Sequence, residues 1–165
     1  MTSFGIHIGN TSACLAVSKD GKTDVVANPT GDRVTPAVVA FTDQEIIVGL
    51  AAKQARLRNM TNTIVNNKQL VVGKLSQEWS NNSPVTITQD NDKIVYEVEF
   101  KEKEHRSSPE DVLVSIYKYI HDIAETHSAD VDQCQCVVTV PLDYNEQERS
   151  VVSKCAARAG RLLIG

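Results

Sequence analysis

The sequence lacks the features that accompany secretion, membrane insertion and nucleic-acid binding. No apolar core follows Met1, so we expect no signal peptide. No apolar run approaches the ~20 residues that a membrane-spanning helix needs. The net charge of −4 at pH 7 argues against a direct nucleic-acid site. We therefore expect a cytoplasmic protein with no membrane contact, whose cysteines are reduced thiols.

Signature motifs for nucleotide loops and metal sites are also missing. The chain contains neither a glycine-rich P-loop nor a dinucleotide fingerprint. Cys134 and Cys136 would share one face of a strand, but no second pair of ligands completes a zinc or redox site, so core packing is favoured. His105, His121 and His127 fit no metal-motif spacing, and we expect them to face solvent. The sequence therefore predicts no metal site.

Acidic residues are absent from one long internal stretch. No Asp or Glu occurs between Ile46 and Gln77. The simpler interpretation is a solvated helical face, and the alternative is a surface that contacts an anionic partner such as a ribosome or an acidic protein. The stretch carries five cations: Lys53, Arg56, Arg58, Lys68 and Lys74.

Strand and turn signals dominate the first part of the chain. Residues 4–8, 14–18 and 23–27 alternate in the manner of strands, and Asp20-Gly21 is a strong hairpin signal. These segments predict a three-stranded antiparallel meander. Further along the chain, we expect strands at 38–41, 46–48, 85–89 and 94–100, helices at 50–58 and 63–72, and a polar loop at 76–84.

The last part of the chain alternates helix and strand. Ser108 followed by Pro109 predicts a helix start, and apolar residues that recur at helical spacing as far as Ala124 predict a helix over residues 109–126. Residues 136–140 form a nearly continuous apolar strand, which suggests burial on both faces. Asn145 should cap a second helix that Gly160 closes, and residues 161–165 resemble the start of another strand.

This order of elements predicts the fold. A crossover through the helix at 109–126 would place residues 136–140 parallel to the first strand and beside it. The result is an α/β, ribonuclease-H-like half-domain. We expect its core in residues 1–27 and 108–165, and a small inserted α+β subdomain in residues 28–107.

The turn Gly9-Asn10-Thr11, between the first two strands, is the candidate ligand site. Such a turn offers backbone N–H groups and a hydroxyl to an anion at close range. An ordinary hairpin turn is the alternative that the local sequence favours. His7 lies where a phosphate–metal site of this shape would carry a carboxylate, and a hydrogen-bonded strand histidine is favoured there over a metal ligand.

Five segments together resemble the seventy-kilodalton heat-shock chaperones, and the resemblance extends to Gly160. Their sequences are GIHIGNT (5–11), GDRVTP (31–36), VGLAAK (48–53), NT with Lys68 (62–68) and VVTVP (137–141), in the order of that family. The resemblance is strongest to its divergent, ribosome-associated branch, whose members similarly carry His in the first strand. It implies the actin/heat-shock-70 ATPase fold. It also implies that the chain is only the first lobe, with the second lobe and the substrate-binding domain absent.

The resemblance also implies roles for individual residues. Gly9, Asn10 and Thr11 match the turn that straddles the β- and γ-phosphates of ATP, and Lys68 matches a lysine that places the attacking water. His7 replaces an aspartate that serves the magnesium shell, and Asn10 replaces a threonine. The residues that match an interdomain relay of nucleotide state are Pro141 and Arg149.

The two replacements, His7 for an aspartate and Asn10 for a threonine, decide between two functional expectations. A neutral imidazole cannot act as a carboxylate in a magnesium–water shell, because Mg²⁺ prefers oxygen ligands. We therefore expect a chaperone or co-chaperone whose full-length form binds Mg-ATP with weak or no hydrolysis. It would assist nascent or unfolded polypeptide at the ribosome with a J-domain partner. The alternative is a conventional ATP-hydrolysing chaperone, and a sugar-kinase or actin-type protein is more distant. The first lobe alone should bind ATP weakly or not at all.

Overall fold

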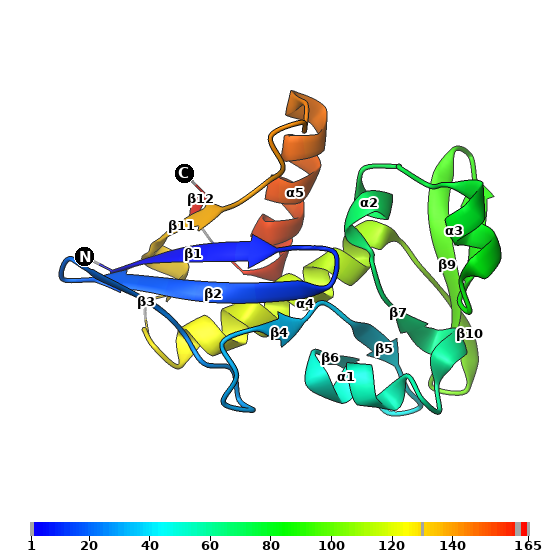
Figure 1. Cartoon of the computed structure of the whole chain (residues 1–165), viewed down its shortest axis with the longest axis horizontal. Coiled ribbons are helices and arrows are strands. Elements are labelled where there is room, and N and C mark those ends of the chain that lie inside the picture. Colours follow the sequence, from blue (N-terminus) through cyan, green and yellow to red (C-terminus); the bar gives the residue numbers. More distant parts are fainter. Residues whose placement is uncertain (1, 130, 161–162, 165) are drawn as a thin grey trace.

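Three β-sheets and two long helices make up the computed structural model, which describes residues 2–129, 131–160 and 163–164 (Figure 1). The largest sheet has the strand order β12-β11-β1-β2-β3, and β4 pairs with β2. Its strands are β1 (Thr2–Ile8), β2 (Ser12–Lys19), β3 (Lys22–Val25), β4 (Thr35–Pro36), β11 (Gln135–Val138) and β12 (Leu163–Ile164).

The pairing in this sheet follows the predicted topology. β1, β2 and β3 form the antiparallel meander, and β11 runs parallel to β1 with Phe4 opposite Cys136. β12 pairs with β11, also in parallel. Three antiparallel strands followed by parallel neighbours confirm the ribonuclease-H-like arrangement.

The helices α4 (Pro109–Glu125) and α5 (Glu146–Ala159) pack against each other and against the sheet (Figure 1). Phe4, Ile6 and Ile8 alternate along β1 and share one buried core with the apolar residues of α4. On the other face His7 is exposed, and Val137 is 57% exposed. The prediction that residues 136–140 are buried on both faces of the sheet was therefore wrong. Among the described residues, the helices cover only one face of this sheet.

Both predicted helix starts are present. Ser108 Oγ accepts a hydrogen bond from the backbone N–H of Asp111 at 3.1 Å, and Pro109 takes the first helical position. Asn145 and Glu148 form a reciprocal capping box with two 2.9 Å hydrogen bonds. Gly160 is the C-cap of α5, as expected.

Two small sheets and three short helices occupy the segment between β4 and α4, to the right in Figure 1. α4 contacts strands of the main sheet and of both small sheets, so it joins the two regions. The boundaries of the inserted subdomain stay a prediction. The elements are β5 (Val39–Phe41), β6 (Ile46–Val48), β7 (Thr63–Ile64), β8 (Thr86–Asp90), β9 (Lys93–Phe100), β10 (Lys103–Ser107), α1 (Leu50–Ala55), α2 (Lys68–Val71) and α3 (Gln77–Asn82).

Several elements in this segment differ from prediction. The helix expected at 63–72 is strand β7 followed by the short α2, because Thr63 and Ile64 pair with β5 and Asn66 adopts a left-handed backbone (φ 55°) that interrupts a helix. The loop expected at 76–84 contains α3, whose first turn is capped by the Ser76 hydroxyl. Strand β10 was not predicted, and α1 is shorter than expected.

Two histidines are less exposed than expected. His121 is only 8% exposed, because it lies at the edge of the buried stripe of α4. His105 is half-buried, with ring centroids 5.6 Å from those of Phe41 and Phe100. His127 is exposed, as predicted. Among the described residues, no helix combines the length and apolarity needed to cross a membrane.

Candidate nucleotide-phosphate site

The β1–β2 turn is held at both ends by backbone hydrogen bonds. The Gly9 N–H donates to the Ser12 carbonyl at 2.8 Å, and the Ala37 N–H donates to the Thr11 carbonyl at 3.0 Å. A Cβ added at Gly9 would lie 3.2 Å from the Ser12 carbonyl oxygen, so a side chain there would strain the turn. The turn is therefore a fixed backbone surface, with the Thr11 side chain exposed.

Asn10 carries a polar atom that the fold leaves unsatisfied. Its Oδ1 is buried and has no hydrogen-bond partner among the described residues. Burying such an oxygen without a partner costs roughly 1–3 kcal/mol. An Asn amide carries both an acceptor oxygen and an –NH₂ donor group, so Oδ1 is an unused acceptor beside the turn.

His7 is hydrogen-bonded across the sheet, as predicted for a strand histidine. Its Nδ1 lies 2.7 Å from Thr139 Oγ1, and the Thr139 N–H donates to the Ile6 carbonyl at 3.0 Å. A Cβ at Gly9 would lie 3.6 Å from His7 Nε2, so the imidazole lies beside the turn. Thr139 was not singled out from the sequence, because its contact with His7 depends on the pairing of β1 with β11.

The side chains at this turn do not fit a magnesium ion. Mg²⁺ prefers carboxylate, phosphate and water oxygens in octahedral geometry, whereas the turn presents an imidazole, an amide and a hydroxyl. Within the described residues, the one cluster of three His, Cys, Asp or Glu side chains with metal-ligand spacing is His121, Asp122 and Glu125 on α4. The turn suits a phosphate group better than a metal.

Lys68, the first residue of α2, lies close to the end of β1. It lines a small cavity of about 20 Å³ together with Ile8, Thr139 and Pro141. Burial lowers the pKa of Lys68, and the negative charge of Asp143 partly opposes this shift. The structure thus brings a cation to the strand end from which the turn begins.

A pair of buried hydrogen bonds, the Asn67 clamp, fixes the start of α2, and only two consecutive asparagines hinted at it in the sequence. Asn67 is 3% exposed. Its Nδ2 donates to the Pro109 carbonyl at 2.8 Å, and its Oδ1 accepts from the Tyr96 hydroxyl at 2.7 Å. Because Lys68 follows directly, the clamp sets its position relative to α4 and β9.

Pro141 and Arg149 are connected through Tyr144. The Tyr144 N–H donates to the Pro141 carbonyl at 3.2 Å, and Arg149 Nε donates to the Tyr144 carbonyl at 3.0 Å. Lys74 Nζ lies 5.4 Å from the centroid of the Tyr144 ring. The structure therefore brings the two relay candidates together, and the relay role itself stays a prediction.

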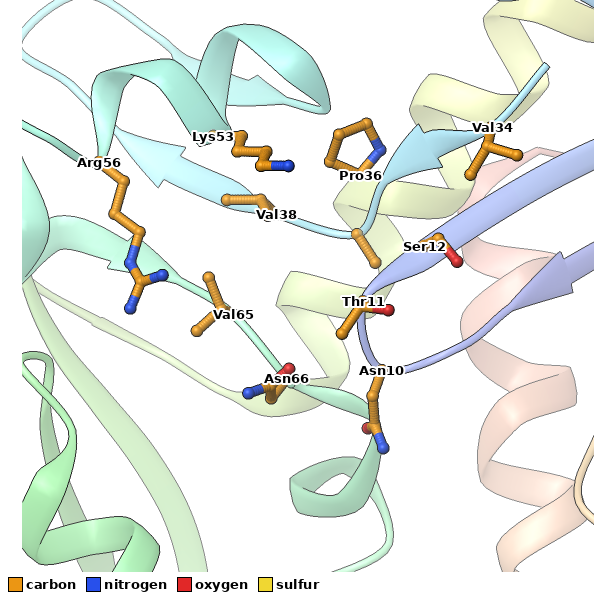
Figure 2. A pocket seen from close by; sticks show the side chains of 11 residues that line it. Asn10, Thr11, Ser12, Val34, Pro36, Val38, Lys53, Arg56, Val65 and Asn66 are labelled. Atoms are coloured by element: carbon orange, nitrogen blue, oxygen red, sulfur yellow. The ribbon is translucent and has the colours of Figure 1, made fainter. Parts of the chain in front are cut away.

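The cations of the acid-free stretch do not share one surface. Lys53 and Arg56 face a cavity of about 510 Å³ that also touches Asn10 and Thr11 (Figure 2). Lys74 instead lies 3.7 Å from Asp143 and 3.8 Å from Glu148 in ion pairs.

Comparison with known proteins gives a consistent family. The family model described as Hsp70 protein matches residues 3–162. Heat shock 70 kDa protein 14 of Rattus norvegicus is 42% identical over an alignment of 164 residues, which covers 97% of this chain and 32% of that protein. Heat shock 70 kDa protein 14-B of Xenopus laevis is 42% identical, and Heat shock 70 kDa protein 14 of Homo sapiens is 41% identical, each over 165 residues with the same two shares. The chain spans about a third of the length of these relatives.

Proposed function

The chain belongs to the Hsp70 family, and from that premise we propose that it is the first lobe of a nucleotide-binding domain that holds ATP phosphates but supports little or no hydrolysis. Family members generally bind nucleotide, which supports ATP as the ligand. The backbone N–H groups of Asn10 and Thr11 would donate to phosphate oxygens, as such turns do, whereas the Gly9 N–H already donates to the Ser12 carbonyl. The Thr11 hydroxyl and the Lys68 ammonium would add a donor and a charge.

His7 is the observation that carries this proposal. A bound magnesium ion would neutralise phosphate charge and organise water around the γ-phosphate. The residue beside the turn is an imidazole whose Nδ1 is engaged with Thr139 at 2.7 Å. It brings no negative charge to attract the ion. Loss of a catalytic electrostatic group typically lowers rates by ~10²–10³.

We propose the partners and the location from the family resemblance. Hsp70 proteins generally bind unfolded polypeptide and J-domain co-chaperones, and we extend both to the full-length protein. Action on nascent chains at the ribosome, in the cytoplasm, rests on the resemblance to the ribosome-associated branch. On this proposal the chain alone binds ATP weakly, because one lobe offers only part of the contacts.

A conventional ATP-hydrolysing chaperone is the second candidate. The position of Lys68 favours it, because a buried clamp at Asn67 holds this cation near the turn. A lysine fixed in that way suits placement of an attacking water.

A chimera tests the two candidates in a complete protein. Residues 3–162 would replace the matching segment of rat Heat shock 70 kDa protein 14, and phosphate release in a single turnover would be followed with Mg²⁺ and with EDTA. We expect background hydrolysis in both conditions. His7→Asp should increase the Mg²⁺-dependent affinity for ATP, and His7→Asn serves as the uncharged control. Mg²⁺-dependent turnover by the chimera at the rate of an ordinary Hsp70 chaperone would refute the first proposal in favour of the second.

A further inference from the structure

The C-terminal end of α4 brings three potential metal ligands close together. His121, Asp122 and Glu125 each offer one ligand atom, and these atoms all lie within 4.8 Å of one another. His121 Nδ1 and Glu125 Oε1 are 3.9 Å apart, because residues four positions apart share one face of a helix. This end of α4 lies at the left of Figure 1, whereas the β1–β2 turn lies at the right-hand end of β1 and β2. The cluster is therefore separate from the proposed phosphate site.

The His121 ring is held in place by the end of α5. A Cβ added at Gly160, the C-cap of α5, would collide with the Cδ2–Nε2 side of the ring, so this side lies directly against the Gly160 backbone. The histidine is only 8% exposed, and its Nδ1 faces Glu125. An imidazole fixed in this way is pre-organised as a ligand, because little side-chain freedom is left to lose when an ion binds.

The charges at this end of the helix also favour a cation. Asp122 and Glu125 are both exposed, and three positions apart on a helix their like charges repel each other. They lie in the last turn of a 17-residue helix, where the negative end of the helix dipole favours positive charge, yet this turn contains no basic residue. Within the described part of the chain, neither carboxylate pairs with a Lys or Arg. A divalent cation would compensate both carboxylates and the dipole.

We propose that this cluster, the α4 metal site, binds Zn²⁺ through His121 Nδ1 and the carboxylates of Asp122 and Glu125, with water as the fourth ligand. Zinc takes nitrogen and oxygen ligands at about 2.0–2.2 Å in tetrahedral geometry, which places neighbouring ligand atoms roughly 3.4 Å apart. The observed 3.9 Å between Nδ1 and Oε1 requires only a small rotation of the exposed Glu125 side chain. An imidazole ligand selects zinc over Mg²⁺, which prefers oxygen ligands. The simpler alternative is a His121–Glu125 ion pair without a metal.

A titration of the 165-residue chain with ZnCl₂ tests the site, with the NMR signals of the histidine ring protons as the readout. The chain has four histidines, so this readout identifies the histidine that binds and distinguishes it from zinc held by cysteine thiols. We expect saturable shifts of the His121 ring signals with Zn²⁺ and none with excess Mg²⁺. Zinc binding that leaves the His121 ring signals unchanged, or equal shifts with Mg²⁺, would overturn the proposal.

Carboxamide variants separate the α4 metal site from an ordinary ion pair. Glu125→Gln and Asp122→Asn should each weaken Zn²⁺ binding about tenfold or more, because each removes a charged ligand. Both side chains are exposed, so folding should be unaffected. Glu110→Gln is the matched control, because Glu110 lies in the first turn of the same helix. An equal loss in Glu110→Gln, or undiminished affinity in Glu125→Gln, would refute the assignment, and an ion pair without a metal would show no zinc affinity at all.

Discussion

Removing the hydroxyl of Tyr96 should destabilise the fold by about 1–3 kcal/mol, because Tyr96→Phe leaves the buried Asn67 Oδ1 without its donor. The hydrogen bond is 2.7 Å long, and the two residues are 0% and 3% exposed, so water cannot replace the lost partner. For a chain of this size, each kcal/mol lowers the melting temperature by about 2–4 °C. Urea or thermal unfolding would measure the loss.

Tyr119→Phe is the matched control. Tyr119 lies on α4 and is half-buried, and its hydroxyl makes no hydrogen bond within the described part of the chain, so its removal should change stability by less than ~0.5 kcal/mol. If Tyr96→Phe is as mild as this control, then the Asn67 clamp does not stabilise α2.

The effect of Tyr96→Phe on stability should also depend on pH. Burial raises the pKa of Tyr96, so the folded protein binds the phenolic proton more tightly than the unfolded chain, in which tyrosine titrates near 10. This contribution to stability is complete below about pH 10 and is lost as the pH rises above it. The stability difference between wild type and Tyr96→Phe should therefore shrink on going from pH 7 to pH 11. A constant difference would contradict the assignment.

Three further predictions concern helix ends and surface charge. Asn145→Ala should lower the unfolding free energy in urea by about 1 kcal/mol, because the backbone N–H of Glu148 loses its acceptor on the Asn145 side chain, while Asn145→Asp retains most of this stability. Gly160→Ala should destabilise by about 1–3 kcal/mol, because the added methyl group would collide with the nearly buried imidazole of His121; an unchanged urea midpoint would show that the ring moves freely. Charge reversal at Lys53, Arg56 and Arg58 should weaken ribosome co-sedimentation and flatten its salt dependence, and unchanged sedimentation across a salt series would identify these residues as an ordinary solvated surface.

Local signals predicted the helix starts and the meander well. Ser108 and Asn145 cap helices through residues only three positions away, so the pattern in the sequence contains the whole interaction. The hairpin at Asp20-Gly21 is equally local. The alternation of the flanking strands likewise placed Gly9, Asn10 and Thr11 at the turn between β1 and β2, where the structure has them.

Features that depend on distant segments were not predictable in this way. Strand β7 exists because β5 pairs with it, and an isolated Thr-Ile-Val sequence does not reveal a partner. The Asn67 clamp joins residues 29 and 42 positions apart. The exposure of Val137 depends on what covers the sheet, which hydropathy along one strand cannot show. The cavity at Lys53 likewise requires the turn and α1 to meet in space.

The parallel pairing of β1 with β11 also constrains how the protein is made. Phe4 pairs opposite Cys136, so the sheet cannot close until the ribosome has released most of the chain. At translation rates of ~5–20 residues per second, the interval between Val25 at the end of β3 and Val138 at the end of β11 is roughly 6–23 s. During that interval Phe4, Ile6 and Ile8 lack part of the core that later covers them. A domain of a chaperone family is thus, during its own synthesis, a polypeptide with uncovered apolar strands.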